Sequence, residues 1–402
     1  MGIGRGFAGF AVFLLVLLTG AAAPAQADEM VNLEVPALTG KAKVGTRSFE
    51  LIDRSRPAGF GMSGKRRLMV QVTYPRKGGA GGCRNAPYLP PGTAERLISY
   101  LNVGAPVDIR TRACRGGAVA RKRLPLIVFS HAYTADRAVY TSLVNDLASR
   151  GYLVASIDHT GDAFAVEFPG GELVEGVYGS PLSSKPITEP ELIGLINVRT
   201  RDVRFVTTWL LKQNRLKKNW LKGRIDRKRI GIFGHSLGGA TATRVALVDK
   251  RFRASADVDG SLFGEWPLTA KSGKPYLLFV AEKGLGAVLG QDKVCRYFGN
   301  AGGPKFAWQL GGAQHLTFSD FQTLAPQVAE RKPDWPFAAL YPIIVGDLDP
   351  AASIRSQRVA IARFFDAYVK SGKRPSKAKA PVPPAGVSAL AGEQLTCARP
   401  AG

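Results

Sequence analysis

The chain has 402 residues, a formal net charge of +24, 45% hydrophobic residues and 21% charged residues. This composition is typical of a soluble globular protein with enough apolar material for a sizeable core. The positive charge suits an anionic membrane surface, but a solvated, lysine-rich exterior is the preferred explanation. A nucleic-acid partner is not expected, because the basic stretch 212–229 offers only Trp220 for stacking on bases.

The N-terminus has the pattern of a secretory signal peptide. Arg5 is followed by the apolar run "FAGFAVFLLVLLTG", and small residues then lead to Ala25-Gln26-Ala27. This order predicts a signal peptide over residues 1–27, with export to the periplasm or the extracellular medium. The alternative is an uncleaved membrane anchor, for which the run is short. No second hydrophobic stretch is long enough to cross a bilayer.

Export favours disulfides, because four cysteines then lie in an oxidising compartment. Four cysteines can pair in three different ways. The preferred one joins Cys83 to Cys114 around a Gly-flanked loop and Cys295 to Cys397 at the tail. No Cys-x-x-Cys pair is present, so we expect no zinc site.

The first half of the mature chain alternates strand-like and helix-like segments. Gly151 suits the position just after a helix C-terminus. The segments are a strand at 68–74, an irregular insertion at about 75–120, a buried strand at 125–130, a helix at 137–150, a strand at 152–158 and a Gly/Pro/Ser-rich insertion at 161–187, a candidate lid or substrate loop.

The second half continues this alternation. Thr188 and Glu191 have the spacing of a capping box, which predicts a helix from Thr188 to about residue 216. Strands follow at 229–234, 254–260, 275–281 and 305–310, then a helix at 353–371 capped by Ser353. The order predicts an α/β fold with a mainly parallel sheet flanked by helices, in one catalytic domain over 28–371. Residues 372–402 read as a flexible, basic, Pro/Ala-rich tail.

The segment "RIGIFGHSLGGATATRVALV" predicts a nucleophile elbow at Ser236. A strand, a sharp turn with glycine at 234 and 238, and a helix follow one another in the order that such an elbow requires. The bare Gly-x-Ser-x-Gly pattern is weak, and an accidental glycine turn is the alternative. The helix N-terminus would also direct backbone N–H groups towards a developing oxyanion.

Only one histidine follows Ser236. The α/β-hydrolase order is nucleophile, acid, base, so His315, in a glycine-bearing loop after the last predicted strand, is the candidate base. A structural histidine is the alternative. His235 lies in the elbow itself, and its side chain should diverge from that of Ser236. His131 and His159 each follow a predicted strand upstream.

The acid has several candidates. Asp257 and Asp259 end the strand 254–260, and their side chains should point to opposite faces. Glu282 and Asp292 follow the next strand, a place that many hydrolases use. Asp259 is preferred because it lies at the carboxyl end of its strand, with Glu282 next.

Five segments in order resemble the platelet-activating-factor acetylhydrolases and their bacterial relatives: "PLIVFSHAYTADRAVYTSL", "ASIDHTGD", "DRKRIGIFGHSLGGATA", "ADVDGSLFGEWP" and "PYLLFVAEKG … GGAQHLTFSDF". The resemblance covers about residues 68–325. It implies an α/β-hydrolase fold and a calcium-independent serine lipase, and it supports Asp259 over Glu282.

The resemblance also implies that the oxyanion is held by the backbone N–H groups of Tyr133 and Leu237. The chain departs from the family here, because His131 is followed by Ala132 where the family usually has glycine. Alanine adopts positive φ less easily, which makes Tyr133 the less secure donor.

These features predict acyl transfer by Ser236, with His315 as base, Asp259 as orienting acid and no metal or organic cofactor. The expected substrates are esters with short or oxidised acyl chains, including phospholipids. A polyester or dienelactone-type hydrolase on the same fold is one alternative. A catalytically inactive cationic protein that binds anionic membranes is the other. The sequence does not indicate an oligomeric state.

Overall fold

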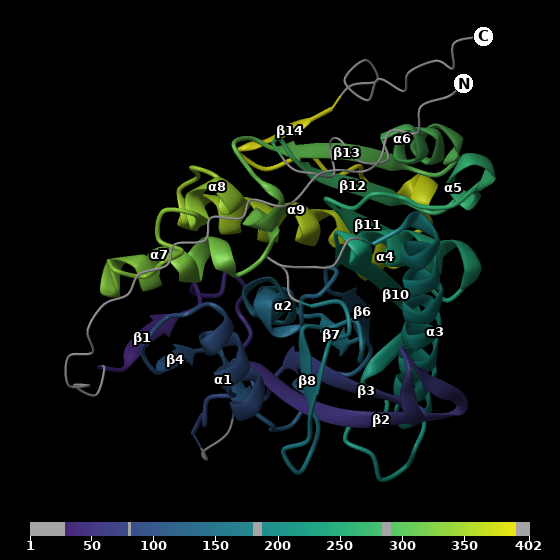
Figure 1. Ribbon diagram of the computed structural model, residues 1–402. Helices are drawn as coiled ribbons and strands as arrows, with labels where there is room; N and C mark the ends of the chain where they lie inside the picture. The colour runs from purple at the N-terminus through teal and green to yellow at the C-terminus, as the bar shows by residue number, and fades with distance from the viewer. Residues whose placement is uncertain (1–28, 79–81, 180–186, 284–290, 391–402) are drawn as a thin grey trace.

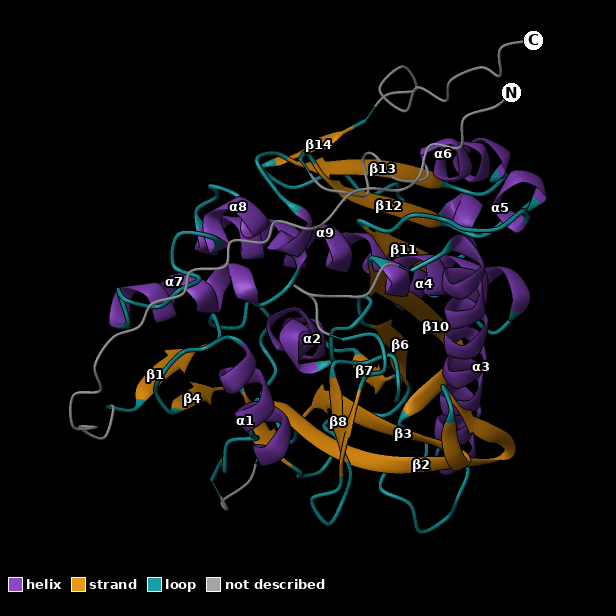
Figure 2. Ribbon diagram, in the orientation of Figure 1, coloured by secondary structure: helices purple, strands orange, loops and turns teal. Residues whose placement is uncertain are grey.

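The computed structural model describes residues 29–78, 82–179, 187–283 and 291–390. Their centre is a ten-stranded sheet in the order β14-β13-β12-β11-β10-β6-β7-β3-β2-β5. The sheet crosses the molecule diagonally with helices on both sides (Figures 1 and 2). This is the predicted α/β architecture, and the predicted fold class is confirmed.

The middle of the sheet is parallel. Its six strands are β6 (Leu124–Ser130), β7 (Leu153–Asp158), β10 (Ile225–His235), β11 (Ala254–Val258), β12 (Tyr276–Ala281) and β13 (Lys305–Leu310). Each overlaps a strand predicted from an apolar run. Because both faces are covered by helices, continuous apolar runs are what such strands need.

Antiparallel strands extend both edges. β3 (Met62–Pro75) pairs with β7 and with the long β2 (Val44–Gly59), whose other edge carries β5 (Ala113–Arg115) in parallel. At the opposite edge β14 (Val387–Ala389) pairs with β13. The expectation of a flexible tail is therefore wrong for residues 387–389.

The alternation of side chains along β6 builds the core on two sides. Ile127 and Phe129 pack with α2 (Thr141–Ser149) and α9 (Pro350–Phe365). Leu126 and Val128 pack on the other face with α3 (Glu189–Gln213) and α4 (Leu237–Val248). All four side chains are fully buried, and burying one such side chain stabilises the fold by about 1.5–3 kcal/mol.

The helix termini largely follow the predicted signals. Thr188 and Glu191 form the capping box at the start of α3, and Gly151 has a φ of 100° just after α2. The start of α9 differs from the prediction. Asp349, not Ser353, caps this helix and accepts a hydrogen bond from the backbone N–H of Ala352, because Pro350 suits the first helical position.

Both predicted insertions contain regular structure. The first holds α1 (Pro91–Tyr100), β4 (Val107–Arg110), which pairs with β1 (Val31–Glu34), and β5. The Cys83–Cys114 disulfide closes this insertion as predicted. The second insertion contains the hairpin of β8 (Ala165–Glu167) and β9 (Leu173–Glu175), while its residues 180–186 lie outside the described ranges.

Further helices follow β11 and β12, and two more lie between β13 and α9. They are α5 (Trp266–Thr269), α6 (Gln291–Asn300), α7 (Phe321–Arg331) and α8 (Tyr341–Val345). The predicted signal peptide (1–27) and Cys397, with its predicted bond to Cys295, lie outside the described residues. No described helix has both the length and the apolar character needed to cross a membrane.

Candidate active site

Ser236 lies in a strained turn between β10 and α4. Its φ of 56° and ψ of −124° belong to a region that non-glycine residues rarely occupy. The backbone N–H of Ser236 donates to the carbonyl oxygen of Val258 at 2.8 Å, which fixes the turn to the end of β11. The residue is only partly buried, and it lies at the carboxyl edge of the sheet, directly after β10.

Glycine is required on both sides of this serine. A Cβ atom on Gly234 would lie 2.2 Å from the carbonyl oxygen of Gly238, and one on Gly238 would lie 2.1 Å from the carbonyl oxygen of Ser130. A Cβ on Gly239 would lie 1.9 Å from Oδ1 of Asp257. The motif residues therefore allow strand, turn and helix to approach closely, as the elbow interpretation expects.

The candidate base and acid are in direct contact. His315 Nδ1 lies 2.5 Å from Asp259 Oδ2, and Asp259 Oδ1 accepts a hydrogen bond from the backbone N–H of Ala281 at 3.0 Å. The carboxylate is fully buried, whereas 21% of the His315 side chain is exposed. A carboxylate in this position accepts the Nδ1 proton, which leaves the other ring nitrogen of His315 as the basic atom.

Sheet topology explains why Asp259 lies beside the turn that carries Ser236. Ser236 directly follows β10, Asp259 directly follows β11, and in the parallel register His235 pairs with Val258. His315 begins the short 3-10 helix His315–Phe318 after β13. The rings of His235 and His315 are 4.5 Å apart between centroids.

The other predicted acids have different environments. Asp257 faces α4 and the next strand, accepting from Tyr276 at 3.3 Å and from Thr243 at 3.4 Å, and burial raises its pKa well above the usual range. Glu282 accepts from the backbone N–H of Gly312 at 2.6 Å and so supports the loop that carries His315. Asp292 is exposed on α6.

The remaining histidines are buried, which favours their neutral forms. Burial lowers the pKa values of His131 and His235 well below the usual range and also lowers that of His159. His235 Nδ1 lies 2.8 Å from the hydroxyl of Tyr140, which gives this side chain a buried partner of its own.

A second Ser-His-Asp arrangement lies beneath the site. Ser130 Oγ is 2.9 Å from His159 Nε2, and His159 Nδ1 is 3.0 Å from Asp202 Oδ2. All three residues are at most 1% exposed, and Arg66 also binds Asp202. A nucleophile needs access to its substrate, so this arrangement is structural. No sequence motif marks Asp202, which lies in the middle of α3.

The candidate oxyanion donors follow two strands that are neighbours in the sheet, β6 and β10. Leu237 begins α4, and Tyr133 lies in the loop after β6. Neither backbone N–H donates to an acceptor in the part of the chain that the structure describes. Ala132 does not have a positive φ, and Thr134 has one instead (54°), so the alanine at 132 does not strain this loop.

Aromatic side chains gather next to Tyr133. Its ring lies 5.5 Å from that of Tyr178, which follows the β8–β9 hairpin, and the Tyr178 ring lies 6.2 Å from that of Phe60 in the β2–β3 turn. These rings pack against the apolar cluster that contains Leu237. The group thus joins the candidate oxyanion loop to the second insertion.

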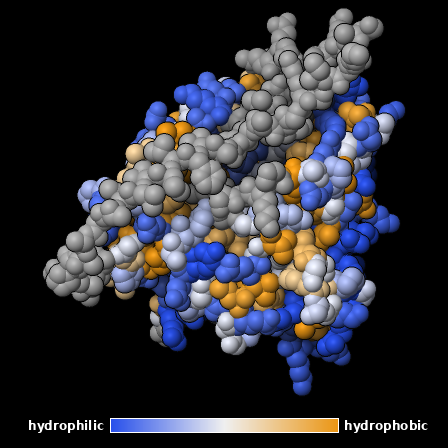
Figure 3. Space-filling model, viewed as in Figure 1, coloured by the Kyte–Doolittle hydropathy of each residue, from blue (hydrophilic) through white to orange (hydrophobic). Residues whose placement is uncertain are grey.

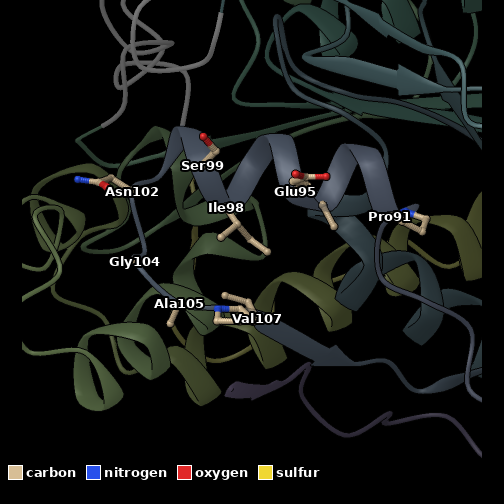
Figure 4. A pocket seen from close by; sticks show the side chains of 10 residues that line it. Pro91, Glu95, Ile98, Ser99, Asn102, Gly104, Ala105 and Val107 are labelled. Carbon is tan, nitrogen blue, oxygen red and sulfur yellow. The ribbon is translucent and has the colours of Figure 1, made fainter. Parts of the chain in front are cut away.

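Among the described residues, His235, Asp259 and His315 could approach a metal, since their ligand atoms lie within 4.8 Å of one another. Two of these atoms already bind each other in the His315–Asp259 contact. Figure 4 shows an open pocket between α1 and the start of β4, and none of the candidate catalytic residues lines it.

Several known esterases are similar to this chain. The family described as platelet-activating factor acetylhydrolase, isoform II, matches residues 97–168 and 202–354. A probable 1-alkyl-2-acetylglycerophosphocholine esterase of Arthroderma benhamiae is 26% identical over 356 residues, which cover 82% of this chain and 87% of that protein. The platelet-activating factor acetylhydrolase of Cavia porcellus is 31% identical over 157 residues, which cover 35% of this chain and 36% of that protein.

A solved structure is similar over most of its length. The ferulic acid esterase of Streptomyces cinnamoneus superposes with a TM-score of 0.70 and 30% sequence identity, covering 89% of this chain and 99% of that one. The chain therefore belongs to the platelet-activating factor acetylhydrolase, isoform II, family, and it is a serine carboxylic ester hydrolase with the α/β-hydrolase fold.

Proposed function

We propose that Ser236 is the nucleophile, His315 the general base and Asp259 the acid that orients the base. The observation that carries this proposal is the 2.5 Å contact between His315 Nδ1 and Asp259 Oδ2, beside a serine with positive φ at the end of β10. In such a triad the base removes the serine proton while the acid stabilises the resulting imidazolium.

The reaction proceeds in two acyl-transfer steps. Ser236 Oγ attacks the ester carbonyl as His315 takes its proton, and the same proton then passes to the leaving alcohol. Water, activated by His315, releases the acyl group from Ser236. The N–H groups of Leu237 and Tyr133 hold the oxyanion in both steps, each contributing about 3 kcal/mol of transition-state stabilisation.

The substrates that we propose are esters with short or oxidised acyl chains, including phospholipids. The support comes from the relatives named as acetylhydrolases and acetylglycerophosphocholine esterases. A series of p-nitrophenyl esters from two to twelve carbons, compared by kcat/KM, tests this proposal. Highest activity at two to four carbons is expected, and a maximum at eight or more would contradict it.

Bulkier aromatic or polyester substrates are the second candidate. The observation that favours them is the aromatic group of Tyr133, Tyr178 and Phe60 beside the candidate oxyanion loop, together with the ferulic acid esterase neighbour. A short-acyl phospholipid and methyl ferulate should be assayed in parallel. If the aromatic ester has the higher kcat/KM, and Tyr178→Ala lowers activity on that ester alone, the second candidate is the correct one.

We also propose that the protein is exported after cleavage behind Ala27, leaving a catalytic domain over 28–371 and a short tail. The Cys83–Cys114 disulfide supports an oxidising compartment. N-terminal sequencing of the protein recovered outside the cytoplasm should begin at Asp28. An intact Met1 on that protein would contradict the proposal.

Finally, we propose that the basic segment 212–229 makes peripheral contact with anionic membranes. It joins α3 to β10 and contains one acidic residue, Asp226. Ser236 lies at the other end of β10, about 30 Å away at 3.3 Å per residue. Contact through this segment would therefore hold the enzyme at a surface while its site faces away from the bilayer.

A further inference from the structure

The loop after β6 is held by a buried arginine from the middle of α3. Arg199 is fully buried, and so is its acidic partner Asp162. The guanidinium group binds the Asp162 carboxylate through Nε and Nη2, the latter at 2.8 Å from Oδ1. Such a pair is expensive to desolvate, so its presence points to a positional role more than to stability.

The same guanidinium group donates to two successive carbonyl oxygens of the loop. Nη1 donates to the carbonyl oxygen of His131, and Nη2 donates to that of Ala132 at 3.2 Å. His131 Nδ1 also lies 2.7 Å from the Ala132 oxygen, while its Nε2 accepts the backbone N–H of His159. That second contact fixes the His131 tautomer in which Nδ1 is the donor.

These contacts determine the direction of the next N–H group. In a planar trans peptide the C=O of one residue and the N–H of the next point in opposite directions, and the described chain has no cis peptide bond. Holding the Ala132 oxygen on the Arg199 side therefore directs the Tyr133 N–H to the opposite side.

The preceding peptide is also fixed. The backbone N–H of Ala132 donates to the Tyr140 hydroxyl at 3.2 Å, and this hydroxyl lies 2.8 Å from Nδ1 of His235, the residue before the candidate nucleophile. The loop is thus connected to the elbow itself. Within the described residues the Tyr133 N–H has no acceptor of its own.

We propose that Arg199, held by Asp162, is a positioning residue that aims the Tyr133 backbone N–H at the oxyanion. This inference rests on the proposed function of Ser236 and on Tyr133 as an oxyanion donor. It assigns a role to a pair that no sequence motif marked, and it explains how a loop without glycine at position 132 can still present its donor.

The test compares Arg199→Lys with Arg358→Lys. Arg358 is a matched control, because it is 2% exposed and also donates to two successive carbonyl oxygens, those of Pro36 and Ala37. For Arg199→Lys, kcat on p-nitrophenyl acetate should fall about 100-fold with KM within threefold of wild type. Arg358→Lys should lower Tm by about as much as Arg199→Lys does, but it should keep wild-type kcat.

Two further measurements separate positioning from general damage. A trifluoromethyl ketone forms an oxyanion-bearing adduct with the serine, so its inhibition constant should rise in Arg199→Lys by about the same factor as kcat falls. The inhibition constant of the product acid should not change. Asp162→Asn keeps the side-chain volume and should have the same effects on kcat, KM and the two inhibition constants. This variant replaces Arg199→Lys in the test if Arg199→Lys does not fold.

Failure of this inference can be distinguished from failure of the proposed function. If Ser236→Ala is inactive but a folded Arg199→Lys or Asp162→Asn has undiminished kcat, or loses activity only through KM, the positioning role is overturned. If Ser236→Ala retains activity, the proposed function itself is wrong.

Discussion

Asp257 and Asp259 lie two positions apart at the end of β11, yet their carboxyl groups have opposite surroundings. Asp257 receives hydrogen bonds from neutral hydroxyls, and burial raises its pKa well above the usual range. Asp259 instead contacts the imidazole of His315. Burial therefore favours the neutral form of the Asp257 carboxyl group, whereas the Asp259 carboxyl group is the one that contacts the candidate base.

This difference predicts opposite results for two matched substitutions. Asp259→Asn should lower kcat by about four orders of magnitude, because an amide cannot stabilise the imidazolium or select its tautomer. Asp257→Asn should stay within threefold of wild type, because Asp257 contacts Tyr276 and Thr243 and asparagine has nearly the same shape. Steady-state kinetics on p-nitrophenyl acetate check both. A greater loss in the Asp257 variant would mean that the roles are reversed.

The order of motifs along the sequence was sufficient to identify Ser236 and His315 as candidate catalytic residues. The position of Asp259 at the end of its strand identified it as the candidate acid. In the structure Ser236 and Asp259 follow the neighbouring strands β10 and β11, and His315 contacts Asp259 from the loop after β13. Arg199 and Asp162 could not be identified in this way. Charged residues within a helix or a loop are usually solvent-exposed, and only the packing of α3 against the loop after β6 shows that these two are buried.

At the scale of elements, Asp320 joins three parts of the fold. Its carboxyl group accepts from the backbone N–H of Ser142 at the start of α2 and from the Tyr88 hydroxyl in the first insertion, and it directly precedes α7. Burial raises its pKa from 3.8 to about 6. The folded protein therefore keeps a proton between pH 4 and 6 that the unfolded chain releases.

The free energy of unfolding should consequently fall as pH rises through this window, by about 3 kcal/mol from this residue. Asp320→Asn should remove that contribution and flatten the dependence between pH 4 and 6, as measured by urea unfolding. Asp334→Asn is the control, because the Asp334 side chain is 79% exposed. If the free energy of unfolding of the Asp320 variant depends on pH as it does in the wild-type protein, Asp320 is not the residue that causes this dependence.

The first insertion depends on its disulfide. Cys83 and Cys114 are 31 residues apart, and a loop of this size gives about 3–4 kcal/mol of stabilisation by restricting the unfolded chain. The double substitution Cys83→Ser/Cys114→Ser should lower Tm while leaving kcat within twofold of wild type. Loss of kcat at a temperature where the variant is folded would show that the insertion supports the site.

Sequence periodicity identified the elements that are buried on both faces and missed those on the edges. β6, β7 and β10 to β13 are apolar runs, so their prediction was direct. β2 reads "VGTRSFELIDRSRPAG", where charged side chains on an outer strand and a proline near its end conceal the strand. β14 is a three-residue strand whose pairing depends on β13 alone. Such edge pairing is a tertiary property that local sequence does not encode.

At the scale of the whole molecule, the net charge of +24 is the dominant feature. On the face shown in Figure 3, hydrophilic residues surround smaller hydrophobic patches. In the segment 212–229, Leu216 is 44% exposed among basic neighbours. Basic and apolar side chains together favour the interface of an anionic bilayer.

Binding to vesicles should therefore depend on lipid charge and on salt. The wild-type protein should sediment with phosphatidylserine-containing vesicles at 50 mM salt and be released at 500 mM, and it should not bind pure phosphatidylcholine. Lys217→Glu/Lys218→Glu/Lys222→Glu should abolish binding without changing kcat on a soluble ester. Equal binding to both vesicle types would contradict contact by charge.

The most direct test of the whole account is to find which serine reacts with a fluorophosphonate probe, using mass spectrometry of the labelled protein. The account predicts a single adduct on Ser236, absent from Ser236→Ala and formed far more slowly in His315→Ala. An adduct on Ser130, from the buried Ser130–His159–Asp202 arrangement, or no adduct at all, would contradict it.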